Sequence, residues 1–319
     1  MESSPNNRKR ADIHTHIWTT DYLDILEKFG KQGTEDYRNI GAGLTDKDLE
    51  SRFALMEKAG VDIQILSAAP LPPHFENKQQ AVQAARFIND QYTAIAGRWP
   101  DKFAAFASLP LPHIDESLIE LDRVMSLPGI KGICFTTSIL GKAPVDPVFT
   151  PLFEELNRRG AVLFFHPEGS SLYSPLIQDY HLTWMIGAIA EDSVCAVQLI
   201  TGGFPVRYPN IRIINSHLGG ALPMITRRLD MHYWERPDTP DKPSVIAGKM
   251  WYDSVAHGHT PALRAAVDTF GADRILLGTD FPYENGDEYG LGISYIADSL
   301  STCESAQILD TNAAQLLQL

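Results

Sequence analysis

Eight short apolar runs recur along the chain, at residues 11–16, 61–67, 103–108, 130–135, 161–166, 211–216, 250–254 and 274–277. Most are rich in Val, Ile and Phe and are bounded by Gly or Pro, as expected of buried parallel strands. Helical patterns separate them, at 49–60, 78–96, 115–125, 147–159, 184–202, 221–231 and 261–269. Eight strands alternating with helices favour a closed barrel over an open doubly wound sheet. We therefore expect an α/β protein built as a single (β/α)8 TIM-type barrel.

The chain length agrees with one such barrel. It has 319 residues, and a (β/α)8 barrel takes about 250 residues plus insertions. No internal repeat, low-complexity tract or linker divides it. We expect one barrel domain over residues 11–319, preceded by a polar, disordered tail at 1–10. An insertion at 17–45 separates the first strand from its helix.

Charge and cysteine content exclude several partners and locations. The net charge of −13 argues against nucleic acid and anionic membranes, which require a basic face. A small anionic substrate remains compatible, because it responds to the local field of its site. The three cysteines, Cys134, Cys195 and Cys303, are odd in number and form no CxxC, so neither a disulfide scaffold nor a thiolate zinc site is indicated. With no secretory signal or long apolar stretch, we expect a soluble cytoplasmic protein.

Residues of metal-binding type occur at the ends of four predicted strands. His14 and His16 close the first run, and their side chains lie on one face because strand residues alternate. His166 closes the fifth run, His217 follows the sixth and Asp280 follows the eighth. In a (β/α)8 barrel the carboxyl ends of all strands meet at the catalytic face. The sequence therefore predicts a metal site at that face.

The types of these residues suggest their roles. His14, His16, His166 and Asp280 form a mixed nitrogen and oxygen ligand set that leaves room for water or substrate. This set suits Zn²⁺, with Mn²⁺ as the alternative, whereas Cu(I) and all-oxygen Ca²⁺ sites fit poorly. We assign His217 as an acid/base group beside the metal, because its ordinary pKa is near neutral. Asp280 has a second carboxylate oxygen and could also transfer a proton.

Four further residues are candidates for substrate contact. His257 belongs to a second His-x-His, but in a Gly-containing loop, so we expect substrate contact rather than metal ligation. Trp184 is expected at the pocket mouth, and Glu168 is either a polar contact or a plain loop acid. Arg52 could clamp a carboxylate through two hydrogen bonds. Its alternative is a solvated charge on a helix face.

The motifs together resemble a known family. They are Asp12–His16, Met56–Val61, Phe165-His166-Pro167, Ser216–Gly220, Gly278–Pro282 and Asn312-Ala313. With them the chain resembles the metal-dependent amidohydrolase superfamily over nearly its whole length. The similarity is to the branch of aminocarboxymuconate-semialdehyde decarboxylase and the non-oxidative aromatic-acid decarboxylases, including the salicylate and 6-methylsalicylate types.

The resemblance has implications for individual residues. It implies that His14, His16, His166 and Asp280 bind one metal ion and that His217 is catalytic. It also places Arg52 and Trp184 in the substrate pocket. Glu168 departs from the semialdehyde decarboxylase, which has Trp there, so the two substrates are expected to differ. Relatives are usually homodimers or homotetramers, and Arg236 lies in a stretch that can reach a neighbouring subunit's pocket.

The leading functional hypothesis is metal-dependent, non-oxidative decarboxylation of an aromatic (ortho-hydroxybenzoate type) or enol-type carboxylic acid, with release of CO2. The alternative is hydrolysis of a lactone or amide by metal-bound hydroxide. A third reading is a binding module with a structural zinc, although such sites favour cysteine-rich shells. Release of CO2 without incorporation of water would distinguish the first from the second.

Overall fold

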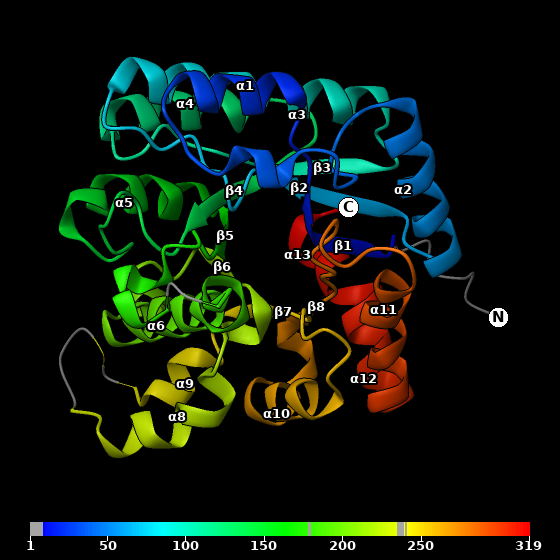
Figure 1. Cartoon of the computed structure of the whole chain (residues 1–319). Coiled ribbons are helices and arrows are strands. Elements are labelled where there is room, and N and C mark those ends of the chain that lie inside the picture. Colours follow the sequence, from blue (N-terminus) through cyan, green and yellow to red (C-terminus); the bar gives the residue numbers. More distant parts are fainter. Residues whose placement is uncertain (1–8, 178–179, 235–238, 240) are drawn as a thin grey trace.

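A closed barrel of parallel strands forms the centre of the molecule (Figure 1). The computed structural model describes residues 9–177, 180–234, 239 and 241–319. The strands follow one another in chain order: β1 (Ala11–His16), β2 (Ile63–Ser67), β3 (Phe103–Ala107), β4 (Ile130–Thr136), β5 (Val162–His166), β6 (Arg212–Asn215), β7 (Trp251–Asp253) and β8 (Ile275–Leu276). The segment that directly follows β8 is joined to β1 by hydrogen bonds from Ile13 N to Leu277 O (2.9 Å) and from Asp280 N to His14 O (2.8 Å). The predicted (β/α)8 barrel is confirmed.

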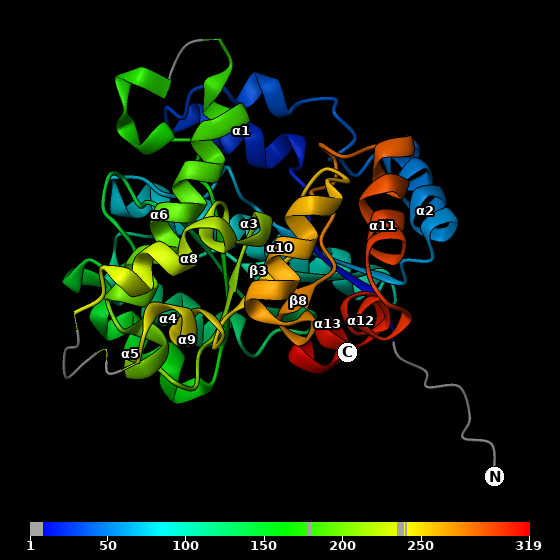
Figure 2. The same ribbon diagram turned by 90° about the horizontal axis from the view of Figure 1, so that it is seen from below.

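Helices surround the strands (Figures 1 and 2). The α-helices are α1 (Thr20–Lys28), α2 (Asp46–Ala59), α3 (Lys78–Arg98), α4 (Ile114–Val124), α5 (Thr150–Arg159), α6 (Ala188–Thr201), α7 (Phe204–Arg207), α8 (Leu222–Met231), α9 (Pro243–Ala247), α10 (Thr260–Phe270), α11 (Asp287–Ser299), α12 (Thr302–Ala306) and α13 (Asn312–Leu317). Short 3-10 or π turns are η1 (Thr34–Tyr37), η2 (Pro147–Phe149), η3 (Ser171–Tyr173), η4 (Pro175–Ile177), η5 (Thr183–Gly187), η6 (His217–Gly219), η7 (Ala272–Arg274) and η8 (Gln307–Thr311). The predicted insertion at 17–45 contains α1 and η1.

The strands match the eight predicted runs, but several are shorter at their ends. The shortest, β8, covers Ile275–Leu276 where 274–277 was predicted. Just beyond it, Gly278 lies so close to its neighbours that a Cβ atom there would come within 2.9 Å of the Cβ atoms of both His14 and Asp253. This close approach of the backbone brings the carboxyl end of β8 against β1 and β7, where the site lies.

The two ends of the barrel are built differently. The interior is filled by apolar side chains, among them Ile13, Phe106 and Phe164, and α13 adds Leu316 and Leu317 to the same cluster. Figure 2 shows α13 at one end of the molecule and α1 at the other. The end with α13 is therefore a packed floor, and polar chemistry is confined to the opposite end, as in other (β/α)8 barrels.

The predicted helix at 184–202 is two elements. It starts with the π-helical turn η5 and continues as α6, and such π turns are frequent at functional sites. The span Thr183–Thr201 has the length and apolar composition of a membrane-crossing helix, contrary to the prediction that the chain lacks such a stretch. In the structure α6 is a core helix, because Cys195 and Leu199 are buried in the main apolar cluster and the carboxylates of Glu191 and Asp192 are buried as well.

Two sequence predictions fall partly outside the described residues. Arg236 lies outside them, as do residues 1–8 of the predicted tail. The other two tail residues are held by ion pairs, Lys9 with Asp101 and Arg10 with Asp310, each at 2.8 Å.

Candidate metal centre and active site

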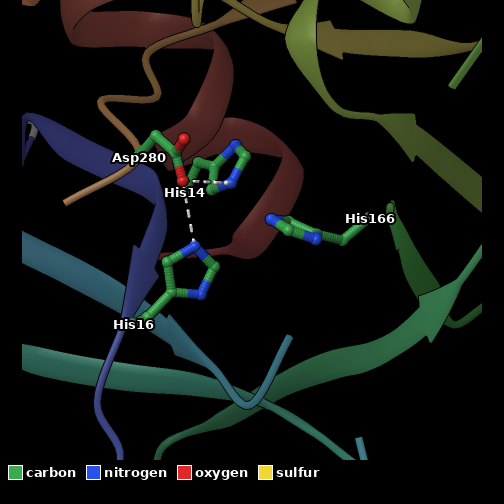
Figure 3. Close-up of side chains that lie close together, drawn as sticks. All are labelled: His14, His16, His166 and Asp280. Carbon is green, nitrogen blue, oxygen red and sulfur yellow. Dashed lines mark hydrogen bonds and ion pairs between the residues drawn. The ribbon is translucent and has the colours of Figure 1, made fainter. Parts of the chain in front are cut away.

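The four predicted metal ligands come together at the carboxyl end of the barrel (Figure 3). One ligand atom from each of His14, His16, His166 and Asp280 lies within 4.8 Å of the other three, and all four residues are buried. Asp280 Oδ1 is 3.2 Å from His14 Nε2 and 3.1 Å from His16 Nε2. The spacing of the motifs along the sequence therefore predicted a real spatial cluster.

The nitrogen of each imidazole that faces away from the cluster is held by the protein. His14 Nδ1 contacts Asp253 Oδ2 at 2.6 Å, and His16 Nδ1 contacts Ser67 Oγ at 3.0 Å. His166 Nδ1 lies 2.8 Å from the carbonyl oxygen of Pro167, to which it donates. Such contacts fix the tautomer and orientation of histidines that bind metals. The rings are thus oriented before any ion arrives.

The nitrogens that face the cluster fit a cation. His166 Nε2 is buried and has no hydrogen-bond partner, and His14 Nε2 is buried with Asp280 Oδ1 3.2 Å away but without a hydrogen bond of good geometry. A buried polar atom without a partner is costly, and native proteins rarely leave one without a reason. Three imidazoles and one carboxylate are the ligand types of open, catalytic Zn²⁺ or Mn²⁺ sites. The donor set therefore fits a divalent metal ion.

Protonation differs among the three histidines. Desolvation opposes the charged form of His14, but the charges of Asp253 and Asp280 outweigh it and raise its pKa to about 9. Burial lowers the pKa of His16 to about 4. The pKa of His166 also falls well below its usual range, mainly through desolvation. At neutral pH two ligands are therefore neutral, whereas His14 carries a proton in the metal-free protein.

We expect metal binding at neutral pH to release about one proton, because a bound imidazole must be neutral. Below pH 9 the apparent affinity should rise by about tenfold for each pH unit, since His14 must first lose its proton. Calorimetric titration with Zn²⁺ in buffers of different ionisation enthalpy measures the proton count. Affinity independent of pH between 6 and 8 would contradict this expectation.

One buried carboxylate connects the metal cluster to His217. Asp253, at the end of β7, is 0% exposed. Its Oδ2 contacts His14 Nδ1, and its Oδ1 accepts hydrogen bonds from the backbone amides of His217 (2.8 Å) and Val255 (3.0 Å). Asp253 therefore positions a ring on β1 and the backbone after β6 at the same time.

Asp253→Asn should lower metal affinity by about 10- to 100-fold, the usual effect of losing such a partner. The amide can keep the two backbone contacts, but its NH2 group would then face His14 Nδ1. His14 would accept there and carry its proton on Nε2, the nitrogen needed for the metal. Metal content after dialysis against a chelator measures the effect. Asp298→Asn, an exposed position on α11, is the matched control and should bind metal like the parent.

His217 lies beside the cluster but outside the ligand set. Its Nε2 is 3.7 Å from Asp280 Oδ2, and its Nδ1 contacts Asp192 Oδ2 at 2.8 Å. Asp192 also accepts from Ser216 Oγ at 2.8 Å. Desolvation disfavours the imidazolium, but Asp192 and Asp280 outweigh it and raise the pKa of His217 well above its usual range. His217 is therefore built to hold a proton next to Asp280.

The backbone at this face adopts strained conformations. Asp280 has φ +65°, and His217 and His257 each have φ +49°. Left-handed conformations of residues other than glycine are uncommon, and they concentrate where surrounding structure serves a function. Here they turn the Asp280 and His217 side chains toward one another at the ends of β8 and β6.

Arg52 has contacts that the sequence did not predict. It is 1% exposed, so the reading of a solvated helix charge is wrong. Its guanidinium donates to His16 O (2.7 Å) and Gln64 Oε1 (3.1 Å) and lies 4.3 Å from the ring centroid of Phe281. Arg52 thereby braces the strand that carries two metal ligands. Contact with a substrate carboxylate stays a prediction.

Glu168 and Trp184 lie near each other, beyond the end of β5. Glu168 is partly buried and accepts a hydrogen bond from Ser138 Oγ. The Trp184 ring packs against Gly169, where a Cβ atom would come within 2.6 Å of it, and the residue is 48% exposed. Both positions are compatible with the predicted pocket mouth, and their contact with substrate stays a prediction.

His257 lies close to His217, across a shared cavity. The two histidines line a cavity of about 510 Å³ together with apolar residues that include Met224 and Val255. His257 Nδ1 contacts Glu284 Oε1 at 2.5 Å, which raises its pKa from the usual value. It is absent from the metal cluster of the described residues. A substrate contact by His257 stays a prediction.

Sequence reasoning missed several supporting residues. Asp253 could have been found, because it lies near the carboxyl end of the seventh predicted run (250–254), the end at which the ligands also lie. Asp192 could not, since it lies within a helical pattern and reaches His217 only through packing of α6. Ser67 gave no signal either, because its partner His16 is distant in the chain.

The barrel and its buried cluster define a class: (β/α)8 proteins with a metal centre at the carboxyl ends of the strands. Within this class the chain belongs to the amidohydrolase family, whose model matches residues 11–319.

Comparison with known proteins gives relatives over most of the chain. It is 28% identical to 2-amino-3-carboxymuconate-6-semialdehyde decarboxylase of Dictyostelium discoideum, over 97% of this chain and 92% of that protein. It is 29% identical to gamma-resorcylate decarboxylase of Rhizobium radiobacter, over 85% and 87%. The solved dihydroxybenzoic acid decarboxylase of Polaromonas sp. JS666, with bound manganese and 2-nitroresorcinol, has a TM-score of 0.79 and 22% identity over 98% of this chain and 97% of that one.

Proposed function

We propose that this protein catalyses metal-dependent, non-oxidative decarboxylation of an aromatic carboxylic acid of the ortho-hydroxybenzoate type, or of an enol-type acid, releasing CO2. The observation that carries the proposal is His217, backed by Asp192 and 3.7 Å from Asp280, next to a cluster that fits a divalent ion. The names of the relatives support the same chemistry.

Each residue has a part in the proposed reaction. His14, His16, His166 and Asp280 hold the metal ion, which supplies Lewis-acid stabilisation and orientation for an acid with an ortho oxygen. Asp280 or His217 donates a proton to the ring carbon that bears the carboxylate. The bond from that carbon to the carboxylate then breaks, its electron pair restores the ring, and CO2 leaves. One proton is gained at the ring carbon and one CO2 is lost from it with no change in electron count, so no redox partner is needed.

The donor set supports Zn²⁺ as the resident ion, and Mn²⁺ is the alternative. Mn²⁺ is present in the solved Polaromonas relative. Metal analysis of the purified protein, followed by removal and reconstitution with each ion, decides between them. If Mn²⁺ restores activity and Zn²⁺ does not, Mn²⁺ rather than Zn²⁺ is the resident ion.

A screen of ortho-hydroxy aromatic acids, followed by CO2 release, tests the function. We expect turnover of at least one acid, loss of turnover after chelation, and no incorporation of solvent oxygen into the product. Hydrolysis of lactones or amides without CO2 release from any acid would instead support the alternative of a metal-dependent hydrolase.

We also propose a homodimer or homotetramer in the cytoplasm. Large apolar side chains are exposed ahead of α6 and on and after α8: Leu176, Tyr180, Met185, Met224, Met231 and Trp234. Exposed apolar side chains that gather in a patch typically mark an interface. All three cysteines are free, as expected in a reducing compartment. Light scattering coupled to size-exclusion chromatography measures the assembly, and a monomer at micromolar concentration would contradict it.

A further inference from the structure

Two neighbouring residues of α6, Glu191 and Asp192, carry buried carboxylates, with exposed fractions of 1% and 4%. They lie near the start of the helix, and α6 packs against both η3, which follows β5, and η6, which follows β6. Asp192 accepts from Ser216 Oγ and contacts His217 Nδ1, each at 2.8 Å. The carboxylate of Glu191 makes its contacts at other strand ends, so the two adjacent residues serve different parts of the same face of the barrel.

Glu191 accepts hydrogen bonds from three donors on two loops. Its Oε2 accepts from Thr137 Oγ1, directly after β4, at 2.7 Å and from the amide of Glu168, after β5, at 2.8 Å. Its Oε1 accepts from the amide of Ser171 at 2.7 Å. An ionised carboxylate offers acceptors only, so both oxygens match the groups that face them. Glu191 therefore joins the loop after β4 to the loop after β5.

The burial of the Glu191 carboxylate is explained by what it holds. Its hydrogen-bond partners among the described residues are a neutral hydroxyl group and two backbone amides. Burying a carboxylate is costly, and only a complete set of hydrogen bonds offsets that cost. An apolar side chain would fill the same space without this cost, but it would leave all three donors without their acceptor.

The segment that Glu191 holds has a strained backbone. Ser171, Leu172 and Tyr173 follow one another with φ of +51°, +55° and +56°. Left-handed conformations are unfavourable for residues that carry a side chain, so such a run persists only where surrounding contacts hold it. One contact is the hydrogen bond from Ser171 Oγ to Thr183 Oγ1 at 2.9 Å, and the other is the amide of Ser171 on Glu191. Without the carboxylate, the first residue of the run would lose one of its two anchors.

The same segment carries the predicted substrate contacts on this side of the site. Glu168 lies two residues beyond the predicted metal ligand His166, and its own amide is one of the donors to Glu191. The Trp184 ring packs against Gly169, which lies between the two amides that Glu191 holds. Loosening of residues 168–171 would therefore disturb both predicted substrate contacts.

We propose that Glu191 is a positioning residue for substrate binding and that the two adjacent carboxylates of α6 have separate roles. Glu191 fixes the segment at 168–171 for recognition, and Asp192 holds His217 for proton transfer. The roles are separable, because the hydrogen-bond partners of Glu191 follow β4 and β5 whereas those of Asp192 follow β6. This inference rests on the proposed function.

Steady-state kinetics of Glu191→Gln tests this role. Glutamine has one oxygen and one NH2 group, so at least one of the three donors would face the NH2 group and lose its acceptor. We expect KM to rise by about tenfold, the scale of one hydrogen bond to a charged group. The value of kcat should change by less than about threefold, because the loss is in binding. The alkaline limb of the pH profile and the metal content should stay at their parental values.

Two further variants give the comparison. Asp192→Asn should show the opposite pattern, with a displaced alkaline limb and a KM close to that of the parent. Glu154→Gln, at an exposed position of α5, is the matched control and should change neither KM nor kcat.

Hydrogen exchange measured by mass spectrometry separates this inference from the proposed function, because it needs no turnover. In Glu191→Gln the amides of residues 168–174 should exchange about tenfold faster than in the parent, while those of residues 215–222 keep their parental rates. That selective result in a protein that decarboxylates nothing would overturn the function and leave the positioning of this segment by Glu191 standing.

Other results would overturn the inference and leave the function standing. One is decarboxylation in which Glu191→Gln keeps the parental KM, or lowers kcat and moves the alkaline limb as Asp192→Asn does. Another is faster exchange throughout the barrel, which would assign Glu191 to general stability. If thermal melting shows that Glu191→Gln does not fold, Thr137→Val provides the test. It removes one donor and should raise KM by about threefold at unchanged kcat, and an unchanged KM would overturn the inference.

Discussion

Asp280→Asn is expected to reduce decarboxylation by on the order of 10⁴-fold, the upper end of what loss of a general acid costs. The substitution removes two roles of the Asp280 carboxylate together, metal ligation and proton transfer. Asp280 Oδ1 lies 3.2 Å from His14 Nε2 and 3.1 Å from His16 Nε2, at the centre of the ligand cluster. Its second oxygen is 3.7 Å from His217 Nε2. The amide is similar in shape but carries no charge and no transferable proton. Single-turnover CO2 release measures the rate.

Metal content must be measured on the same sample. If Asp280→Asn also weakens binding, saturation with the metal should restore occupancy without restoring activity. An inactive variant with full metal content identifies a chemical role beyond ligation. A variant with near-normal turnover would exclude Asp280 from proton transfer and from obligatory metal binding alike.

His217→Asn should lower kcat by about 10² to 10³-fold while metal content stays at the parental level. His217 is absent from the four-residue cluster, so its loss removes no ligand. Because Asp192 raises the pKa of His217, the imidazole is protonated over a wider pH range than usual. Activity that needs this proton should fall as the pH rises through that raised pKa.

Asp192→Asn is the matched variant for His217, since it leaves the imidazole in place and removes the carboxylate that holds its proton. The alkaline limb of the pH profile should move to lower pH, with a smaller loss at the optimum than His217→Asn gives. An unmoved alkaline limb would show that a different group, such as Asp280, supplies the proton.

The architecture followed from local patterns. Apolar runs of strand length alternating with helical periodicity predicted eight strands in the right places, because burial of parallel strands requires such runs. The exact residues at which strands and helices begin and end were less predictable. The two-residue strand β8 depends on the packing of Gly278 against His14 and Asp253, which no local pattern reveals. Likewise, the π turn before α6 gave no periodic signal.

The metal cluster was predictable and its surroundings were not. His14, His16, His166 and Asp280 all occur at strand ends, and barrel topology alone brings such positions together. The orientation of the Arg52 side chain, unlike the positions of the ligands, does not follow from the barrel topology. Its contact with the carbonyl of His16 depends on how α2 packs on the barrel, which sequence periodicity does not specify.

Asp253 has a consequence for how this site could change over evolution. One carboxylate orients His14 through one oxygen and the backbone of His217 through the other. A substitution at Asp253 that alters metal binding should therefore also displace His217, and the effects of changes at the two histidines should be non-additive. Glu168 and Trp184, the predicted substrate contacts beyond β5, are not among the contacts of Asp253. We therefore expect changes in the metal centre and at His217 to occur together, whereas changes at Glu168 or Trp184 can occur separately.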